Sequence, residues 1–173
     1  MKFTSFSLLA LGLTSSVLAS PTRTERKVTL VERDLATMTS IIAAVSAKVD
    51  DLQSAIDAYN GGDVSAIGEA SAAVIAATKQ GAQEASQSSD LSLTDAVGLA
   101  KPVQDLTDKV QSSINDLDSK SDQVVAAGAA GQVLASLKAQ KAAAEQLADA
   151  ITSKVPESSQ ALAKQLSAGI ANA

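Results

Sequence analysis

The chain has 173 residues, with 14 Lys and Arg against 19 Asp and Glu, so its formal net charge at pH 7 is −5. It contains no Cys and no His, which excludes imidazole and thiolate chemistry in both catalysis and metal binding. The acidic balance argues against nucleic acid or an anionic membrane as the main partner. We therefore expect a non-enzymatic protein without a cofactor or a metal site.

The first nineteen residues have the pattern of a secretory signal peptide. Lys2 provides a positive start, and Phe6–Leu13 is an apolar stretch too short to span a bilayer. Val17 and Ala19 are small residues of the kind that a signal peptidase accepts. A retained anchor would need about 20 apolar residues, and serines interrupt the stretch. We predict cleavage after Ala19 and a secreted, extracellular protein, with an association with the cell wall left open.

The remaining chain is expected to form one helical domain over residues 28–173. Residues 20–27 are polar and contain a proline, which predicts a mobile arm or a short pro-segment. Loss of Lys2 leaves 13 Lys and Arg against 19 Asp and Glu, a net charge of −6. Alanine supplies 32 of the 154 mature residues, which favours helix over strand, and Tyr59 is the single aromatic residue.

The clearest pattern in the sequence is an apolar seam that predicts a first helix. Its members follow one another at spacings of three and four, as one face of a helix requires. They are Val28, Val31, Leu35, Met38, Ile42, Val45, Val49, Leu52, Ile56 and Tyr59. Gly61–Gly62 should end the helix, because glycine readily adopts the left-handed conformation of a helix C-terminus.

A second helix should begin at Asp63 as its N-cap and run to about Ala85. Its inward stripe is narrower and more polar than the first: Val64, Ile67, Ser71, Val74, Thr78, Ala82 and Ala85. The buried hydroxyls of this stripe allow two interpretations. They can donate to the carbonyl four residues back, or they can hold the polar head of a lipid whose chain lies between helices. The pattern favours the first.

Further helices follow after polar turns. Ser92 and Asp95 have the spacing of a capping box, and Pro102 predicts a kink or break near Ala100. The inward face of this third helix comprises Ala96, Leu99, Val103, Leu106, Val110, Ile114 and Leu117. A fourth helix should run from the turn at 119–122 to about Lys154.

The fourth helix has an apolar face that one polar residue interrupts. Val133, Leu137, Ala144, Leu147 and Ile151 lie on that face, where Gln140 interrupts them. Gly128 and Gly131 should weaken its first turns. Pro156 suits the first turn of a last helix, in which the apolar positions are Leu162, Leu166 and Ile170.

These elements predict an all-α fold, an antiparallel bundle of four to five helices with short loops. A long coiled-coil rod would show the same periodicity, but the loops at 60–63, 86–92 and 119–122 favour a bundle. The nearest carboxylate pairs, Asp50–Asp51 and Asp116–Asp118, do not share a helix face, so they are expected to be solvated.

Several short strings in this order resemble a family of fungal secreted proteins, the hydrophobic surface binding protein A family. That family also contains antigenic cell-wall galactomannoproteins. The resemblance covers roughly Leu30 to Ile170. The strings that carry it are Asp34–Leu35, Ala58–Tyr59 followed by Gly61–Gly62, Leu93–Thr94–Asp95–Ala96, Leu137–Lys138, Ala150–Ile151 and Val155–Pro156.

The resemblance implies a five-helix fold, secretion, and binding of hydrophobic surfaces or of lipids such as fatty acids. It also implies possible recruitment of a secreted, cutinase-like hydrolase that degrades polyesters. The chain stops at Ala173 without a hydrophobic tail, so no glycolipid anchor is expected. The alternative is a structural or antigenic cell-wall protein with no ligand cavity. A serine hydrolase without histidine is a remote third.

If a lipid is enclosed, we expect it against the seam that faces the second helix. The residues predicted to bind it are Val49, Leu52, Ile56, Tyr59, Ile67, Ser71 and Val74. Adsorption by opening of an alanine-rich, weakly packed core is the other mode that the sequence allows.

Overall fold

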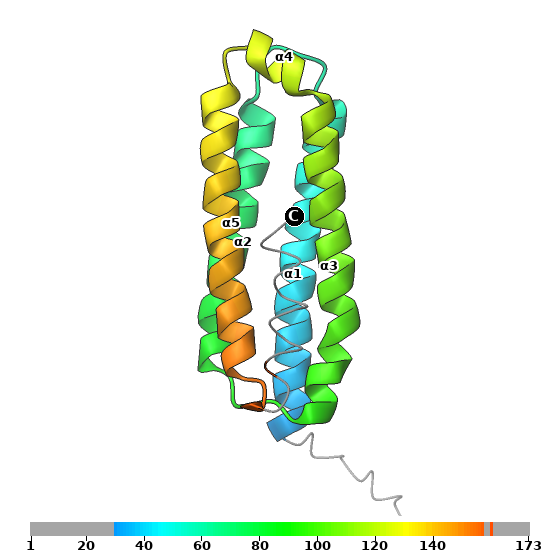
Figure 1. The fold of residues 1–173 in the computed structure, drawn as a ribbon, viewed down its shortest axis with the longest axis vertical. Coiled ribbons are helices and arrows are strands. Elements are labelled where there is room, and N and C mark those ends of the chain that lie inside the picture. The colour runs from blue at the N-terminus through cyan, green and yellow to red at the C-terminus, as the bar shows by residue number, and fades with distance from the viewer. Residues whose placement is uncertain (1–29, 158–159, 161–173) are drawn as a thin grey trace, which may run out of the picture.

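This computed structural model describes residues 30–157 and 160. Its main elements are five helices. They are α1 (Leu30–Ala58), α2 (Ser65–Gln87), α3 (Leu93–Ser119), α4 (Ser121–Ala126) and α5 (Ala130–Ser153), shown in Figure 1. Within the described residues there is no strand, and the predicted all-α fold is confirmed. The predicted signal peptide, the arm at 20–27 and the apolar positions of the last helix lie outside the described residues.

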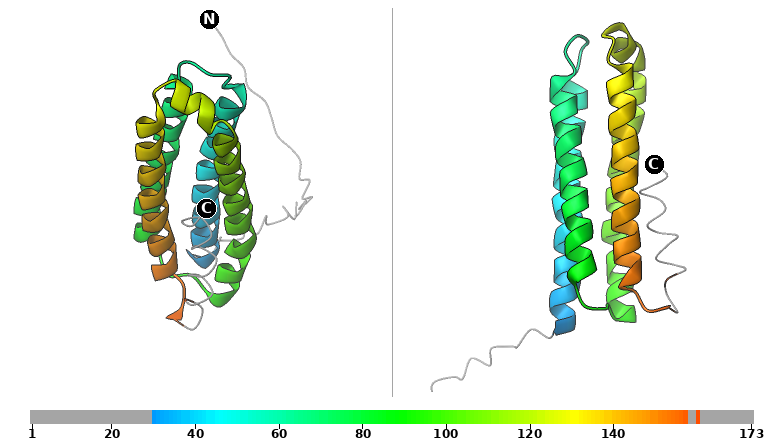
Figure 2. Two further views of the ribbon diagram at one scale, coloured as in Figure 1. Left: turned by 45° about the horizontal axis from the view of Figure 1, so that its top comes forward. Right: turned by 90° about the vertical axis from the view of Figure 1, so that its left-hand side faces the viewer.

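The four long helices run side by side as an antiparallel bundle, and α4 crosses one end (Figure 1). Figure 2 shows two layers, with α1 and α2 in one and α3 and α5 in the other. Close packing joins α1 to α2, α1 to α3, and α2 to α5, whereas α3 and α5 do not pack closely against each other. The described bundle is therefore tightly joined along three of its four sides.

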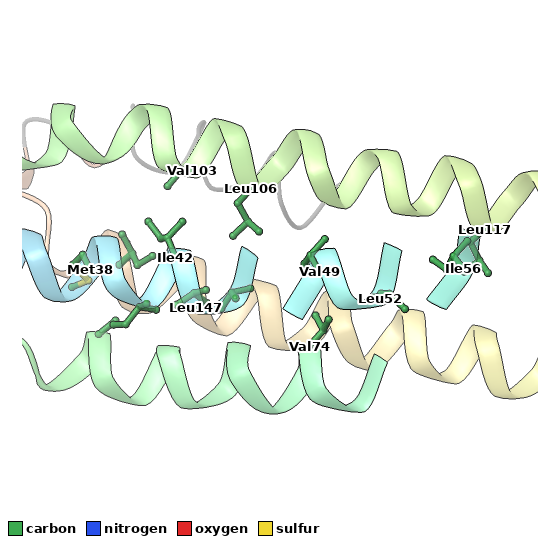
Figure 3. Close-up of a cluster of buried hydrophobic side chains, with 14 of the residues drawn as sticks. Met38, Ile42, Val49, Leu52, Ile56, Val74, Val103, Leu106, Leu117 and Leu147 are labelled. Atoms are coloured by element: carbon green, nitrogen blue, oxygen red, sulfur yellow. The ribbon is translucent and has the colours of Figure 1, made fainter. Parts of the chain in front are cut away.

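The predicted seam of α1 forms the centre of the core. From Met38 to Tyr59 every predicted seam residue is buried, and Ile41 is buried as well. Figure 3 shows these side chains between α3 and α2, with Leu106 and Leu147 reaching in from α3 and α5. Burial of each such side chain contributes about 1.5–3 kcal/mol, and α1 carries more of the buried apolar residues than any other described helix.

The first turn between helices confirms one prediction and shifts another. Gly61 and Gly62 have φ values of 96° and 90°, so the chain leaves α1 through the left-handed region as predicted. The N-cap of α2 is Val64, not Asp63 as predicted. The Asp63 carboxylate instead accepts hydrogen bonds from the Ser65 hydroxyl (2.6 Å) and the Ser65 N–H (2.9 Å). These two bonds lower the pKa of Asp63.

The start of α3 is the capping box predicted from Ser92 and Asp95. The Ser92 hydroxyl accepts from the Asp95 N–H, and the Asp95 carboxylate accepts from the Ser92 N–H, both at 3.2 Å. The predicted break near Ala100 is wrong, because α3 continues through Pro102. Proline costs a helix one hydrogen bond. Burial of Leu99 and Val103 on either side of it keeps this stretch packed against α1.

The predicted fourth helix is divided in two. Gly128 has a φ of 71°, a left-handed conformation that ends α4 and allows α5 to start at Ala130. The predicted polar turn at 119–122 is shorter than expected, since α4 already begins at Ser121. Of the two glycines that were expected only to weaken the helix, Gly128 marks its interruption, whereas Gly131 lies in the first turn of α5.

Gly81 provides a test of the close approach between α1 and α2. A Cβ atom at this buried position would lie 2.5 Å from the Ile41 Cγ2 atom, and the branched Ile41 side chain is stiff. We expect Gly81→Ala to lower the free energy of unfolding by about 1–2 kcal/mol, because overpacking outweighs the gain in helix propensity. Chemical denaturation followed by circular dichroism measures this.

The matched control is Gly98→Ala in α3, where an added Cβ would meet Leu35 at an ordinary 3.7 Å. This variant should raise the free energy of unfolding by about 0.5–1 kcal/mol. Equal effects of the two substitutions would contradict the close α1–α2 contact.

Candidate functional site

The side of the bundle where α3 and α5 do not pack closely contains a large apolar cavity. Its volume is about 260 Å³. All four long helices contribute to it, through Val45, Val49, Val74, Thr78, Leu106, Val110, Ile114, Leu137, Lys138, Gln140, Lys141, Ala144 and Leu147. The lining is apolar except for one threonine, one glutamine and two lysines, which is the composition of a typical ligand pocket.

A second cavity, of about 210 Å³, continues this space toward α4. Ile114 and Leu137 line both cavities, so they adjoin along the same side of the bundle. Val125 and Leu134 line the second cavity and expose 63% and 53% of their surface. The two cavities together form an apolar groove with an exposed apolar mouth at the α4 end. We call this the α3–α5 groove.

The groove exists because of what α5 carries on its inward face. Ser136, Gln140 and Ala144 line the space toward α3, and these side chains are too small or too polar to fill it as leucines would. Val110 on α3 and Leu137 on α5, which line the same cavity, remain only half-buried. The sequence showed this weakness as the interruption of the apolar face at Gln140.

Contacts at both ends of the bundle hold the helices that border the groove. The Leu91 N–H donates to the Lys154 carbonyl at 2.7 Å, which joins the α2–α3 loop to the end of α5. At the other end the Tyr59 hydroxyl donates to the Gln123 carbonyl at 3.2 Å, and Lys120 donates to the Tyr59 carbonyl. The ends of the helices are thus connected, while in the described part of the chain α3 and α5 do not pack closely against each other.

Two buried serines, Ser71 and Ser113, line a small void of about 20 Å³ beside the groove. The Ser113 hydroxyl has no hydrogen-bond partner among the described residues. A buried hydroxyl without a partner is unfavourable, and a void of this size holds about one water molecule. Thr78 differs, because its hydroxyl donates to the Val74 carbonyl at 2.8 Å. The hydrogen bond to the carbonyl four residues back, which was expected for the α2 hydroxyls, is therefore found at Thr78.

The structure brings six of the seven predicted lipid-binding residues to this region. Those that line the small void are Val49, Leu52, Ile56, Ile67 and Ser71. Val49 and Val74 line the large cavity. Tyr59 lines neither, since its ring is buried near α4 and its hydroxyl binds a backbone carbonyl.

Sequence reasoning missed the contributions of α3 and α5 to the site. It placed a ligand between the first and second helices, whereas the open space lies on the side of α3 and α5, with α1 and α2 as its floor. The half-polar face of α5 was the available signal. Across the described ranges, no set of acidic side chains could hold a metal ion. In the same residues no helix is long and apolar enough to cross a bilayer.

Comparison with known proteins defines the family. The model of the family described as hydrophobic surface binding protein A matches residues 35–153. This chain belongs to that family. The resemblance identified in the sequence is thereby confirmed.

Hydrophobic surface binding protein A relatives include cell wall mannoprotein 1 of two Aspergillus species. The protein of Aspergillus flavus is 48% identical over 96% of this chain, and that of Aspergillus fumigatus is 44% identical over 98%. This chain spans 58% and 56% of the length of these two relatives. The names agree with the predicted extracellular location and support the association with the cell wall that the sequence left open.

Two solved domains of the Penicillium marneffei MP1 protein have the same fold. Ligand-binding domain 1, complexed with arachidonic acids, matches with a TM-score of 0.78 and 34% identity over 81% of this chain and 93% of that domain. Ligand-binding domain 2, complexed with multiple arachidonic acids, matches with a TM-score of 0.78 and 34% identity over 82% and 92%. The bundle of this chain is thus similar to bundles that were solved with fatty acids.

Tyr59→Phe separates a structural role of Tyr59 from its predicted role in lipid binding. Loss of the hydrogen bond to the Gln123 carbonyl should lower the free energy of unfolding by about 1 kcal/mol. Binding of fatty acid should not change, because Tyr59 lines no cavity. Thermal unfolding and a fatty-acid titration of the same variant measure the two effects. Weaker binding with unchanged stability would restore the original prediction.

Proposed function

We propose that this protein binds a fatty acid or a similar single-chain lipid in the α3–α5 groove. The observation that carries the proposal is an apolar cavity of about 260 Å³ in the interior of a bundle whose remaining sides are packed. The two related MP1 domains that were solved with arachidonic acids support the choice of ligand class. The role that we propose is non-enzymatic binding, which is supported by relatives whose names describe a cell wall mannoprotein and ligand-binding domains.

The physical basis of binding is transfer of an alkyl chain from water to the groove. Each buried methylene contributes about 0.8 kcal/mol, so ten of them contribute about 8 kcal/mol before the entropic cost of association. Val45, Val49 and Val74 form the floor that would receive the chain, and Val110 and Leu137 flank it. Contact with the ligand would complete the packing that these half-buried flanking residues lack.

Adsorption to hydrophobic surfaces is a second candidate function, favoured by the exposed mouth of the groove. Val125 and Leu134 are large apolar residues that remain exposed where the 210 Å³ cavity opens near α4. Exposed apolar patches at a cavity mouth are typical of sites that meet lipids or other apolar matter. Recruitment of a cutinase-like hydrolase stays a prediction from the family resemblance.

Filling the cavity tests whether the groove holds the lipid. Ala144→Phe would place a ring in the 260 Å³ cavity, which Ala144 lines while half-buried. We expect stoichiometric binding of a long-chain fatty acid by the wild-type protein and a loss of affinity of at least about tenfold in the variant, which is about 1.4 kcal/mol of binding free energy. Isothermal titration and native mass spectrometry measure the affinity and the stoichiometry.

The matched control is Ala142→Phe, an exposed position on the same helix that lines no cavity. It should bind fatty acid like the wild type, and both variants should keep the helical circular dichroism signal. Equal affinity of all three proteins would show that lipid does not occupy the groove. Absence of binding by the wild type would favour the purely structural wall protein.

A further inference from the structure

Two lysines are the only charged side chains of the described residues that line the large cavity. Lys138 and Lys141 lie one turn apart on α5 and border the cavity opposite the apolar residues of α1 and α3. Among the described residues no Asp or Glu lines this cavity, and Asp118 lines only the adjoining smaller one, although acidic residues outnumber basic ones in the chain as a whole. The border of the cavity is thus locally positive in an acidic protein.

Neither lysine is engaged by a carboxylate in the described part of the chain. The ion pairs there join Lys48 to Asp51, Lys101 to Asp105, and Lys109 to Asp50. Glu145 lies one turn beyond Lys141 on the same helix and is exposed, yet it forms no ion pair with that lysine. Both ammonium groups therefore remain available to an anion at the edge of the groove.

The buried serines offer a competing position for a polar head group, but not for a charged one. The void beside Ser113 has room for about one water molecule, and no cationic side chain lines it. An ionised carboxylate is strongly destabilised in a buried site without a counter-charge. Beside Lys138 and Lys141 the carboxylate would keep part of its hydration and lie near two positive charges. The alkyl chain would then enter the large cavity.

We propose that Lys138 and Lys141 form an anion-recognition site that makes the groove selective for anionic over neutral single-chain amphiphiles. The inference rests on the proposed lipid-binding function and adds the chemical class of the head group and the orientation of the ligand. The head group lies at the α5 border, and the chain extends inward over Val49 and Val74.

Paired ligands that differ only in the head group test this site. Dodecanoate and dodecanol are titrated at neutral pH and low ionic strength by displacement of an uncharged fluorophore. The wild-type protein should bind dodecanoate more tightly than dodecanol. The double variant Lys138→Gln/Lys141→Gln should bind dodecanoate about five- to tenfold more weakly and dodecanol with unchanged affinity. Added salt should weaken dodecanoate binding in the wild type and not in the double variant.

Two control variants separate charge at the border from other effects. Lys79→Gln removes an exposed lysine on α2 that lines no cavity, so it should leave both affinities unchanged. Ser113→Ala tests the buried hydroxyl and should leave the preference for the anionic ligand in place. All substitutions of lysine are at exposed helical positions, so circular dichroism should show an intact bundle.

Unchanged dodecanoate binding by the double variant would overturn the anion site. Loss of the anionic preference in Ser113→Ala would overturn it as well and would move the head group to the buried serine. Binding of dodecanol and dodecanoate with equal affinity by the wild type would refute this inference while the proposed function stands. Binding of neither ligand by the wild type would remove both.

Discussion

Burial of the apolar seam of α1 against two neighbouring helices is the interaction on which the rest of the structure depends. The seam contacts α2 on one side and α3 on the other, and its residues from Met38 to Ile56 are almost completely buried. Because the apolar surface of α1 is buried against α2 and α3, its burial does not require α3 and α5 to pack against each other. The chain without disulfides is held by this packing and by hydrogen bonds at the two ends of the bundle.

The same arrangement explains why the α3–α5 groove lies where it does. If α5 carried leucine at every inward position, it would pack against α3 and leave no space. In α5 these positions include Ser136, Gln140 and Ala144, and the apolar residues opposite remain half-buried. The protein thus maintains an incomplete core at a position where a ligand can complete it. Stability supplied by α1 offsets the contacts that α5 does not make.

Polar groups around the groove divide into two kinds with different physical consequences. Ser113 is neutral and buried without a partner, so it favours a water molecule or another small hydrogen-bonding group. Lys138 and Lys141 are charged and lie at the border of the groove, where an anion can approach without full loss of its hydration. Membership in the hydrophobic surface binding protein A family, together with this arrangement, is consistent with a protein that handles amphiphiles and not only apolar solids.

The sequence by itself determined the helical class, the α1 seam, the glycine turn at Gly61–Gly62 and the capping box at Ser92, because these features depend on local periodicity and local hydrogen bonding. Of the residues that the sequence predicted to bind lipid, Val49 on α1 and Val74 on α2 line the floor of the groove. The tertiary structure decided what local signals do not encode. The burial of Leu99 and Val103 keeps α3 continuous through Pro102, and the left-handed Gly128 separates α4 from α5. Which pair of helices stays apart depends on the fit of side chains from four helices at once, and only their packing in space placed the groove between α3 and α5.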